Sequence, residues 1–489
     1  MLIAGMLLSC LLWWLFVEKD LSEQIYFCVR HNGQTDIIYL CKSDNKNGNS
    51  TYYLFLPSYA ELSEVTVVTT QGEPVYIGEY RLQDGQNISE LEMQKAYSLN
   101  YGHSAGEFMV IRSAKTAALF IDTKDDSLRK VNADRVNTAK ANVDIYDEQG
   151  VAVYRSDNEY RNKFHGRGNS TWLAPKKPYR IKLSEKADLF GMGASKKWVL
   201  LANAYDETQM RNKVVYDFAA QLGTLWAPSS VYVDLYVDGQ YLGLYQLTET
   251  IEVSEVRLHI PEDAIFFLTN YKNHWDSDAI GFYTDGRKSI EMKGSFSSTR
   301  ENAALLRDRL NTFEKAINEQ DASQLTNMVD FDSWVDMYLV HEVFLNGEME
   351  LNSCYFYWDI AGDGLIHAAL VWDFDLSLGN DNTVWTAAYG DPRKLLIPDE
   401  LYSWVPGLLG IEAFREKVIS RYQDVFCPLL SQLMDSGLTE LEEEIDGART
   451  MNDIRWRGKL NKKSANSVAA TERMRDFLEH RILFLSQRQ

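Results

Sequence analysis

Cysteine is scarce in this sequence, and its spacing excludes the folds that depend on it. Only five cysteines occur among 489 residues, and none lies in a CxxC or Cys/His cluster. A disulfide scaffold is therefore excluded, and a zinc site is not expected. Cys28 and Cys41 flank a turn signal, H-N-G-Q at 31–34, and two alternatives stay open for them: a disulfide across two strands or two free buried thiols.

Positive charge is in deficit. The chain carries 50 Lys and Arg against 70 Asp and Glu, a formal net charge of −20. Binding to nucleic acid depends on Lys and Arg contacts with phosphates, so no nucleic-acid partner is expected. The excess of acid suits a basic partner, or it only keeps the protein soluble.

The chain also lacks a hydrophobic run of full membrane-spanning length. The apolar run at 2–17 is shorter than the ~20 residues that a spanning helix usually needs, and no Lys or Arg precedes it. Residues 1–20 are interpreted, in order of preference, as an uncleaved N-terminal anchor, a signal peptide, or a lipoprotein signal with L-L-S-C at 7–10. Each alternative predicts a membrane-anchored or secreted, extracytoplasmic protein.

The rest of the composition is that of a globular protein with two or three domains, since 45% of residues are hydrophobic and 25% are charged. Short runs of β-branched and aromatic residues recur through 21–130, and this pattern predicts a small all-β, sandwich-like accessory domain. A polar stretch at 124–141 is interpreted as a linker, and a larger domain is expected over 131–489.

A pair of acids stands out in the segment V-W-D-F-D-L-S-L-G-N at 371–380, directly after a predicted strand. Asp373 and Asp375 are two residues apart, so on an extended segment they face the same way. Hard cations such as Mg²⁺ take carboxylate oxygens, and the pair is therefore a candidate metal site. The alternative is a solvated turn with one capping aspartate.

A second segment combines glycine with positive charge: H-G-R-G-N-S-T-W at 165–172, followed by P-K-K-P-Y-R-I-K-L at 175–183. Glycine lets backbone N–H groups approach an anion, and Arg167 can pair with a phosphate. Arg180 and Lys182 fall on one face of the predicted strand. The segment is a candidate nucleotide-phosphate site, or else a β-hairpin with a basic solvent face.

Other elements place these motifs in order. A helix is predicted from Asp206 to Gly223, a hairpin with an Asp-Gly turn at 231–249, and helices through 299–345. An acidic loop at 346–352 then precedes a hairpin and the Asp373 segment. This is the order of parts in the catalytic half of protein kinases.

Taken together, these motifs resemble the spore coat protein H (CotH) kinase family. The matching pieces are G-R-G-N-S-T-W at 166–172, K-K-P-Y-R-I-K-L at 176–183, K-K-W-V-L-L-A-N at 196–203, M-R-N at 210–212, V-D-L-Y-V-D-G-Q-Y-L-G-L-Y-Q-L-T-E at 233–249, V-W-D-F-D-L-S-L-G-N at 371–380 and D-I-R-W at 453–456. The resemblance covers about 141–489. It implies an α+β, atypical protein-kinase-like fold that uses ATP and Mg²⁺ or Mn²⁺ to phosphorylate serines of spore coat or other surface proteins.

The resemblance also implies roles for single residues. Asp373 would bind the catalytic metal, with Asp375 in support. Four further residues would hold the nucleotide: Arg167 and Asn169 in the phosphate loop, Lys182 on the phosphates, and Glu249 near the adenine. Lys177 is the alternative to Lys182.

One departure from the family concerns the catalytic acid. The family has Asn-x-Asp in its catalytic loop, whereas this chain has Asn346-Gly347-Glu348. A misplacement of ~1 Å can cost on the order of 10²-fold in rate. Glu348 is the predicted catalytic residue together with Asp373, and Glu350 is the alternative if the loop is shifted. Two other functions stay open: an inactive surface adhesion or scaffold protein, and transfer of AMP. For the kinase, a basic, serine-rich protein substrate is expected.

Overall fold

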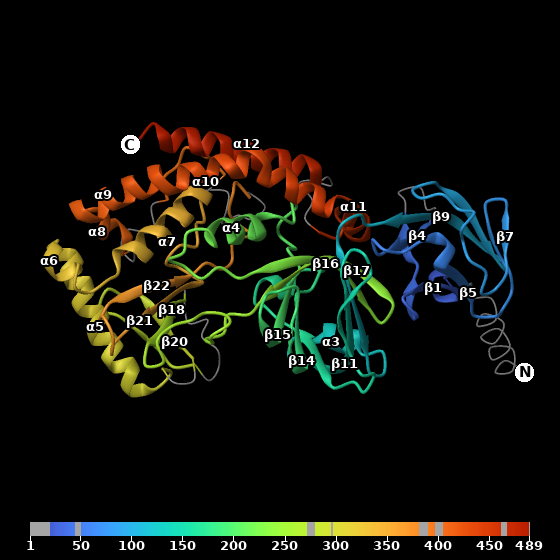
Figure 1. Cartoon of the computed structure of the whole chain (residues 1–489), viewed down its shortest axis with the longest axis horizontal. Coiled ribbons are helices and arrows are strands. Elements are labelled where there is room, and N and C mark those ends of the chain that lie inside the picture. Colours follow the sequence, from blue (N-terminus) through green and yellow to red (C-terminus); the bar gives the residue numbers. More distant parts are fainter. Residues whose placement is uncertain are drawn as a thin grey trace, which may run out of the picture.

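The computed structural model describes residues 20–44, 50–270, 279–294, 297–380, 390–396, 404–460 and 467–488. The fold is mixed, with many strands and several long helices, which confirms the predicted α+β class (Figure 1). The predicted anchor at 2–17 lies outside the described residues. Within the ranges given above, no helix is long and apolar enough to cross a membrane.

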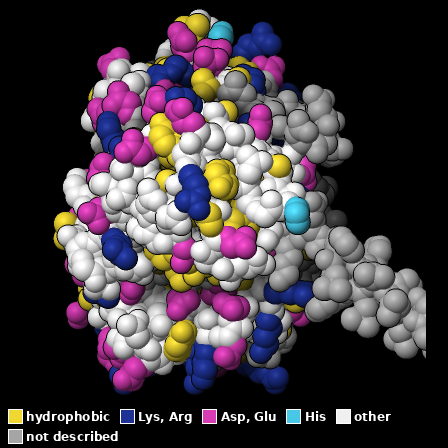
Figure 2. Space-filling view, turned by 90° about the vertical axis from the view of Figure 1, so that its right-hand side faces the viewer, with side chains coloured by type: hydrophobic (Ala, Val, Ile, Leu, Met, Phe, Trp, Pro, Cys, Tyr) yellow, Lys and Arg dark blue, Asp and Glu magenta, His cyan; other side chains and the backbone are white. Residues whose placement is uncertain are grey.

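Two sheets form the N-terminal part, at the right of Figure 1. The short helix α2 (Leu21–Gln24) and the 3-10 turn η1 (Leu62–Glu64) accompany them. One sheet has the order β2 (Gln34–Tyr39), β1 (Ile25–His31), β5 (Val65–Thr69). The other has the order β3 (Cys41–Asp44), β4 (Ser50–Leu56), β9 (Ser104–Arg112), β8 (Tyr97–Tyr101), β6 (Val75–Ile77), β7 (Tyr80–Leu82). Figure 2 shows acidic and basic side chains interspersed on the outer end of this part.

The N-terminal part shares a hydrophobic core with the rest of the molecule. Phe27, Phe55 and Phe108 are fully buried there and lie in the same cluster as Tyr236 and Tyr241, which come from later strands. The Tyr236 hydroxyl donates to the Phe55 carbonyl (3.3 Å). The two parts are therefore joined by buried apolar surface.

An eight-stranded sheet forms the middle of the molecule. Its order is β10 (Ala117–Thr123), β16 (Ser230–Val237), β17 (Gln240–Glu249), β15 (Ala194–Leu201), β14 (Tyr179–Asp188), β13 (Asn162–Gly166), β11 (Thr138–Tyr146), β12 (Ala152–Arg155). β10 pairs with β11 as well as β16, so the strands close into a ring from which β12 extends. The 3-10 turn η2 (Thr171–Leu173) lies between β13 and β14.

A five-stranded sheet follows, with the order β19 (Gly281–Tyr283), β20 (Ser289–Lys293), β18 (Ile265–Thr269), β21 (Cys354–Trp358), β22 (Ile366–Leu370). Helices α5 (Arg300–Glu319), α6 (Ala322–Leu325) and α7 (Phe331–Phe344) accompany it and confirm the predicted helical region at 299–345. The buried apolar residues of α5 and α7 pack into one large core with residues of both sheets.

The C-terminal helices run along the upper edge of Figure 1 and join the two sheets. They are α8 (Val405–Leu409), α9 (Glu412–Arg421), α10 (Cys427–Gln432), α11 (Leu438–Trp456) and α12 (Ser467–Ser486), with π-helical segments at Tyr422–Phe426 and Leu433–Gly437. α11 packs on β17 and reaches β9, while α12 packs on α7. Helix α4 (Arg211–Ala219) lies beneath them.

Two local expectations differ from the structure, and the two alternatives left open for Cys28 and Cys41 are decided in favour of free thiols. β10, on the N-terminal side of the predicted boundary at residue 130, belongs to the eight-stranded sheet, because strand pattern alone does not say which sheet a strand joins. The predicted linker at 124–141 contains α3 (Leu128–Ala133) and the start of β11. Cys28 and Cys41 are free cysteines in strands of different sheets.

Candidate functional site

A cleft of about 840 Å³ lies between the eight-stranded and five-stranded sheets. One wall is the face of β14 and β15 that carries Arg180, Lys197 and Val199. The connection from β17 to β18 supplies residues between 250 and 264, and the wall from the five-stranded sheet includes Phe266 and Tyr355. A cleft of this size between two sheets is large enough for a nucleotide-sized ligand.

The cleft walls carry charges of both signs. Arg167, Arg180, Lys197 and Lys293 line the cleft together with three glutamates, and Lys197 already pairs with Glu252 (2.8 Å). The Arg167 guanidinium lies 5.8 Å from the ring centre of Trp372, and its buried Nε has no hydrogen-bond partner among the described residues. Burial and the nearby Arg180 lower the pKa of Arg167, whereas Asp373 acts in the opposite direction. An anionic ligand would supply the missing partner.

Three carboxylates gather beside this basic wall. Burial raises the pKa of Asp373, against the opposing effects of Arg167 and Ser353. Burial, then Asp373 and Glu348, raise the pKa of Asp375 well above its usual range. Burial and Asp373 raise the pKa of Glu348 to about 8. The cluster therefore holds more negative charge than its surroundings compensate.

Helix α4 fixes the backbone of the Asp373 segment. The Asn212 side chain accepts a hydrogen bond from the Phe374 N–H (2.8 Å), and the Tyr216 hydroxyl accepts one from the Asp373 N–H (3.3 Å). Asp373 itself adopts a left-handed conformation, with φ +70°. This region is uncommon for residues other than glycine, and aspartate and asparagine are among those that tolerate it best. The hydrogen bonds from α4 hold that conformation in place.

A buried ion pair holds the other end of the segment. Arg211 pairs with Asp206, and the Arg211 Nε also donates to the Ser377 carbonyl (3.0 Å). The sequence predicted that Asp206 begins a helix, but α4 begins at Arg211. Asp206 instead accepts from the Thr208 and Arg211 N–H groups, both at 2.9 Å, so its carboxylate organises the turn before the helix.

The loop after α7 brings Glu348 to the cluster and takes Glu350 away from it. The Asn346 side chain bridges the two segments, donating to the Asp373 carbonyl (3.2 Å) and accepting from the Glu348 N–H (3.2 Å). Glu350 is buried, pairs with Lys288 at 2.9 Å, and accepts from the N–H groups of Trp404 (2.7 Å) and Val405 (2.9 Å). The Glu350 carboxylate is therefore fully engaged by Lys288 and by the backbone at 404–405, away from the Asp373 cluster.

Asp373, Asp375 and Glu348 do not line the cleft themselves, and the remaining candidates lie outside its lining too. Lys182 shares the cleft face of β14 with Arg180 but is exposed, and it pairs in register with Lys197. Lys177 donates to the Trp172 carbonyl (2.6 Å) and stacks on that ring. The Asn169 side chain accepts from Arg135 (2.6 Å).

Glu249 is 3% exposed and turns away from the cleft. Its Oε2 accepts from the Ser229 N–H (2.8 Å), and its Oε1 lies 3.7 Å from Arg257 Nε. The neighbouring residues 250–255 line the cleft in its place.

Sequence reasoning missed Lys197, Lys293 and Lys176. The K-K-W motif could have indicated Lys197 from the sequence. Lys293 lies in the short strand β20, where no sequence motif marks it. Lys176 is fully buried, and burial lowers its pKa to about 7. It donates to Gln209 (3.0 Å) and to the Leu244 carbonyl (2.6 Å), so it serves the sheet and not the cleft.

The donor set beside the cleft suits a hard divalent cation. Asp373, Asp375 and Glu348 are oxygen donors whose raised pKa values show uncompensated negative charge, which a cation would relieve. Among the described residues, no group of three or more His, Cys, Asp or Glu is arranged to hold a metal ion. An ion here would depend on two carboxylates together with oxygens of a bound ligand or of water. Asp373 and Asp375 are the residues that would hold the ion.

Comparison with protein families matches residues 164–485 to the family described as "CotH kinase protein". The inner spore coat protein H of Bacillus subtilis (strain 168) is 27% identical over 245 residues, which are 49% of this chain. The chain spans 65% of the length of that relative. Because the family match covers more than half of the sequence and agrees with the motifs, the chain belongs to the CotH kinase family.

Proposed function

We propose that this protein is an atypical protein kinase that transfers phosphate from ATP to serine residues of a coat or surface protein, with Mg²⁺ or Mn²⁺. In this proposal residues 131–489 and β10 form a protein-kinase-like domain, and the N-terminal sheets form an accessory domain. Family membership supports the reaction class, and the cleft between the two sheets supports its location.

The observation that carries the proposal is the meeting of opposite charges at one end of the cleft. Arg167 lies within electrostatic reach of Asp373, yet its Nε has no hydrogen-bond partner in the described part of the chain. Arg180 and Lys197 extend the basic wall along the same sheet face. A cation held by Asp373 and Asp375 would offset the negative charge of a polyphosphate bound along Arg167 and Arg180.

The protein's own residues have separate tasks. Asp373 and Asp375 would hold the cation, which would supply positive charge to neutralise the phosphates. Arg167, Arg180 and Lys197 bind phosphate oxygens and fix their orientation. Glu348 accepts the proton that the serine hydroxyl loses as its oxygen bonds to the terminal phosphorus and the bond to ADP breaks. A carboxylate with a raised pKa is suited to this task, because a base works best near the operating pH.

The partner and location are proposed on thinner support. The net charge of −20 favours a basic, serine-rich protein substrate. A coat or surface location follows from the relative's name, and the apolar run at 2–17 would add contact with a membrane.

Transfer of labelled phosphate from ATP to a basic, serine-rich peptide, or to the protein itself, tests the proposal. We expect transfer by the wild type, an unchanged or higher rate for Glu348→Asp, and a rate about 10²-fold lower for Glu348→Gln. Nucleotide binding is followed in parallel as the shift in unfolding temperature with ATP and Mg²⁺. Asp373→Ala should abolish that shift. Asn169→Ala should leave it, because the Asn169 side chain accepts a hydrogen bond from Arg135 and, in the described part of the chain, has no contact with the acid cluster.

The glutamate at position 348, where the family has aspartate, favours one alternative: a kinase-like surface scaffold that binds nucleotide without turnover. A thermal shift with ATP but no transfer by either wild type or Glu348→Asp would establish this alternative. Full activity of Glu348→Gln would show that Glu348 is not the base.

A further inference from the structure

Four lysines stand side by side across the eight-stranded sheet, one on each of the strands β11, β13, β14 and β15. Lys140 lies opposite Lys163 in the strand register, and Lys163 lies opposite Lys182. Lys182 in turn lies opposite Lys197. Neighbouring strands are about 4.8 Å apart, so these four residues, the lysine row, extend over about 14 Å.

The lysine row lies on the outer face of the ring of strands. Side chains alternate between the two faces of a strand. The residue next to each lysine is buried in the core inside the ring: Ala139, Phe164, Ile181 and Trp198. The lysines therefore point outward, and all four are exposed.

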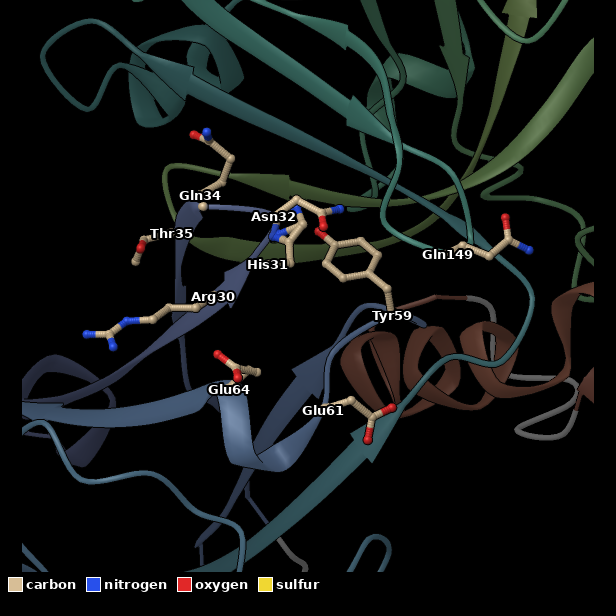
Figure 3. Close-up of a pocket in the computed structure, with 10 residues that line it drawn as sticks. Arg30, His31, Asn32, Gln34, Thr35, Tyr59, Glu61, Glu64 and Gln149 are labelled. Carbon is tan, nitrogen blue, oxygen red and sulfur yellow. The ribbon is translucent and has the colours of Figure 1, made fainter.

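Other strands of the ring have their outer face covered by the N-terminal part. Phe120 of β10 and Tyr236 of β16 belong to the hydrophobic core of that part. At this junction, shown in Figure 3, the ring centres of His31 and of Tyr146 at the end of β11 are 4.4 Å apart. The lysine row lies on the part of the outer face that is left open to solvent.

The positive charge of the lysine row is largely uncompensated. Like charges directly opposite each other destabilise a sheet, and the chain has 70 acidic residues that could pair with them. Lys197 pairs with Glu252 (2.8 Å), but the other three lysines form no ion pair with any described residue. The pKa of His165, on the same face, is lowered by burial and also by the positive charges of Arg180 and Lys163. An anionic partner would relieve this repulsion.

The size and place of the lysine row narrow the kind of partner. One end of the row reaches the cleft, because Lys197 and the neighbouring Arg180 line it. Its length of about 14 Å is that of about four residues of an extended chain. Nucleic acid or a membrane would extend beyond the row, over the surface of a chain with a net charge of −20. A short anionic segment that leads into the cleft fits better.

The choice of lysine favours phosphate as the anionic group. Lysine binds phosphate oxygens as a point charge, whereas the planar fork of arginine matches a carboxylate better. In an extended segment, side chains two residues apart face the same way at about 7 Å. Two phosphoserines at this spacing would both lie within the length of the row.

We propose that the lysine row docks a serine-rich substrate segment that already carries phosphoserines. The proposal rests on the proposed kinase function, because the phosphoserines are the product of that reaction. Phosphates from earlier turnovers hold the segment on the row while a further serine enters the cleft. The substrate is basic before the first transfer and gains affinity for the row as phosphates accumulate.

Binding of labelled peptides to the full chain without ATP, followed by fluorescence anisotropy at low salt, tests the docking step. The probes are a basic, serine-rich peptide, the same peptide with two phosphoserines two residues apart, and a third with glutamates in their place. We expect the phosphopeptide to bind at least tenfold tighter than the other two. Lys140→Gln combined with Lys163→Gln should weaken its binding about fivefold, as expected for two exposed charge pairs.

The matched control combines Lys95→Gln with Lys315→Gln, which removes the same charge from two other exposed sites, in the N-terminal part and on α5. It should bind the phosphopeptide as the wild type does, and the thermal shift with ATP and Mg²⁺ should be the same in all variants. Equal binding of the phosphorylated and unphosphorylated peptides, or undiminished binding by the Lys140 and Lys163 variant, would overturn the proposal. Equally tight binding of the glutamate peptide would indicate an acidic partner and would overturn it too. So would binding to vesicles of anionic phospholipid without binding of the phosphopeptide.

Phosphate transfer separates this proposal from the kinase function. With the wild type, the phosphopeptide should have a KM about tenfold lower than the unphosphorylated peptide at a similar kcat, and the Lys140 and Lys163 variant should lose that difference. Phosphopeptide binding without any transfer would contradict the kinase function and support the docking site. Transfer to the unphosphorylated peptide without phosphopeptide binding would do the reverse.

Discussion

Two glutamates that are two residues apart have opposite electrostatic surroundings. Glu350 faces the Lys288 ammonium and two backbone N–H groups, which compensate its charge. Glu348 faces the carboxylate of Asp373, which opposes it. The sequence E-M-E offers no means of telling the two apart, because the difference comes from side chains more than 20 residues away.

We expect Glu348→Gln to raise the unfolding temperature in the presence of a chelator. The pKa of Glu348 is raised in the folded state, so its ionisation destabilises the fold as pH rises from about 4.5 to about 8. The variant should therefore gain most at pH 8.5 and little at pH 4, as thermal denaturation can measure. An equal gain at both pH values would show that charge is not the cause.

Glu350→Gln is the matched comparison for this variant. It leaves Lys288 buried without its partner, and breaking a buried pair costs about 3–5 kcal/mol. We therefore expect it to unfold at a much lower temperature at neutral pH. If both glutamine variants shift in the same direction, the assignment of roles in this loop is wrong.

The basic residues show which parts of the candidate site can be predicted from the sequence and which cannot. The Gly-rich turn predicted from the sequence includes Arg167, which lines the cleft, and Asp373 of the acid pair lies within electrostatic reach of it. Lys182 was predicted to contact the phosphates, with Lys177 as its rival, yet Arg180 on the same face of β14 is the residue that lines the cleft. Which of the two meets the ligand depends on where the opposite wall ends, and that wall comes from residues 250–297.

At the scale of elements, α4 is the support of the Asp373 segment. Asn212→Ala removes the acceptor of the Phe374 N–H and leaves a buried donor unpaired, which costs about 1–3 kcal/mol. We expect lower thermal stability together with loss of the shift that ATP and Mg²⁺ produce. Lys213→Ala is the control on the same helix, because Lys213 pairs with the half-exposed Asp217 and has no contact with the Asp373 segment among the described residues. Unchanged nucleotide binding by Asn212→Ala would contradict this role for α4.

Elements with strong local signals were predictable. The hairpin of β16 and β17 has its Asp238-Gly239 turn as expected, since both residues adopt positive φ values. The start of α4 was not predictable. Asp206 has the sequence pattern of a helix cap, but its carboxylate pairs with Arg211 and accepts a hydrogen bond within the preceding turn. A local pattern cannot distinguish a cap from a buried ion pair.

At the scale of the whole molecule, Gly239 marks the contact between the two parts. The Tyr39 N–H donates to the Gly239 carbonyl (2.8 Å), and a Cβ on Gly239 would lie 2.6 Å from the Tyr39 ring. We expect Gly239→Ala to lower the unfolding temperature more than Gly72→Ala. Gly72 has a similar φ, +70° against +73°, but nothing within 4 Å of a Cβ. Equal effects in thermal denaturation would mean that the contact contributes little.

Domain organisation was the least predictable property. The β pattern through 21–130 was read as one unit, yet β10 joins the later sheet, and Tyr236 and Tyr241 join the earlier core. Periodicity reports which side of a strand is buried, and not which partner buries it. The pairing is decided by residues over 100 positions away.

The ring of strands has a consequence for synthesis. β10 leaves the ribosome first, but its parallel partner β16 begins at Ser230, and β17 ends at Glu249. Pairings this distant in sequence form slowly, because the loop must close before the contact is gained. A nascent chain shorter than about 250 residues therefore exposes the apolar strand A-A-L-F-I at 117–121 with one side unpaired. We infer that the growing chain depends on chaperones until the hairpin of β16 and β17 has emerged.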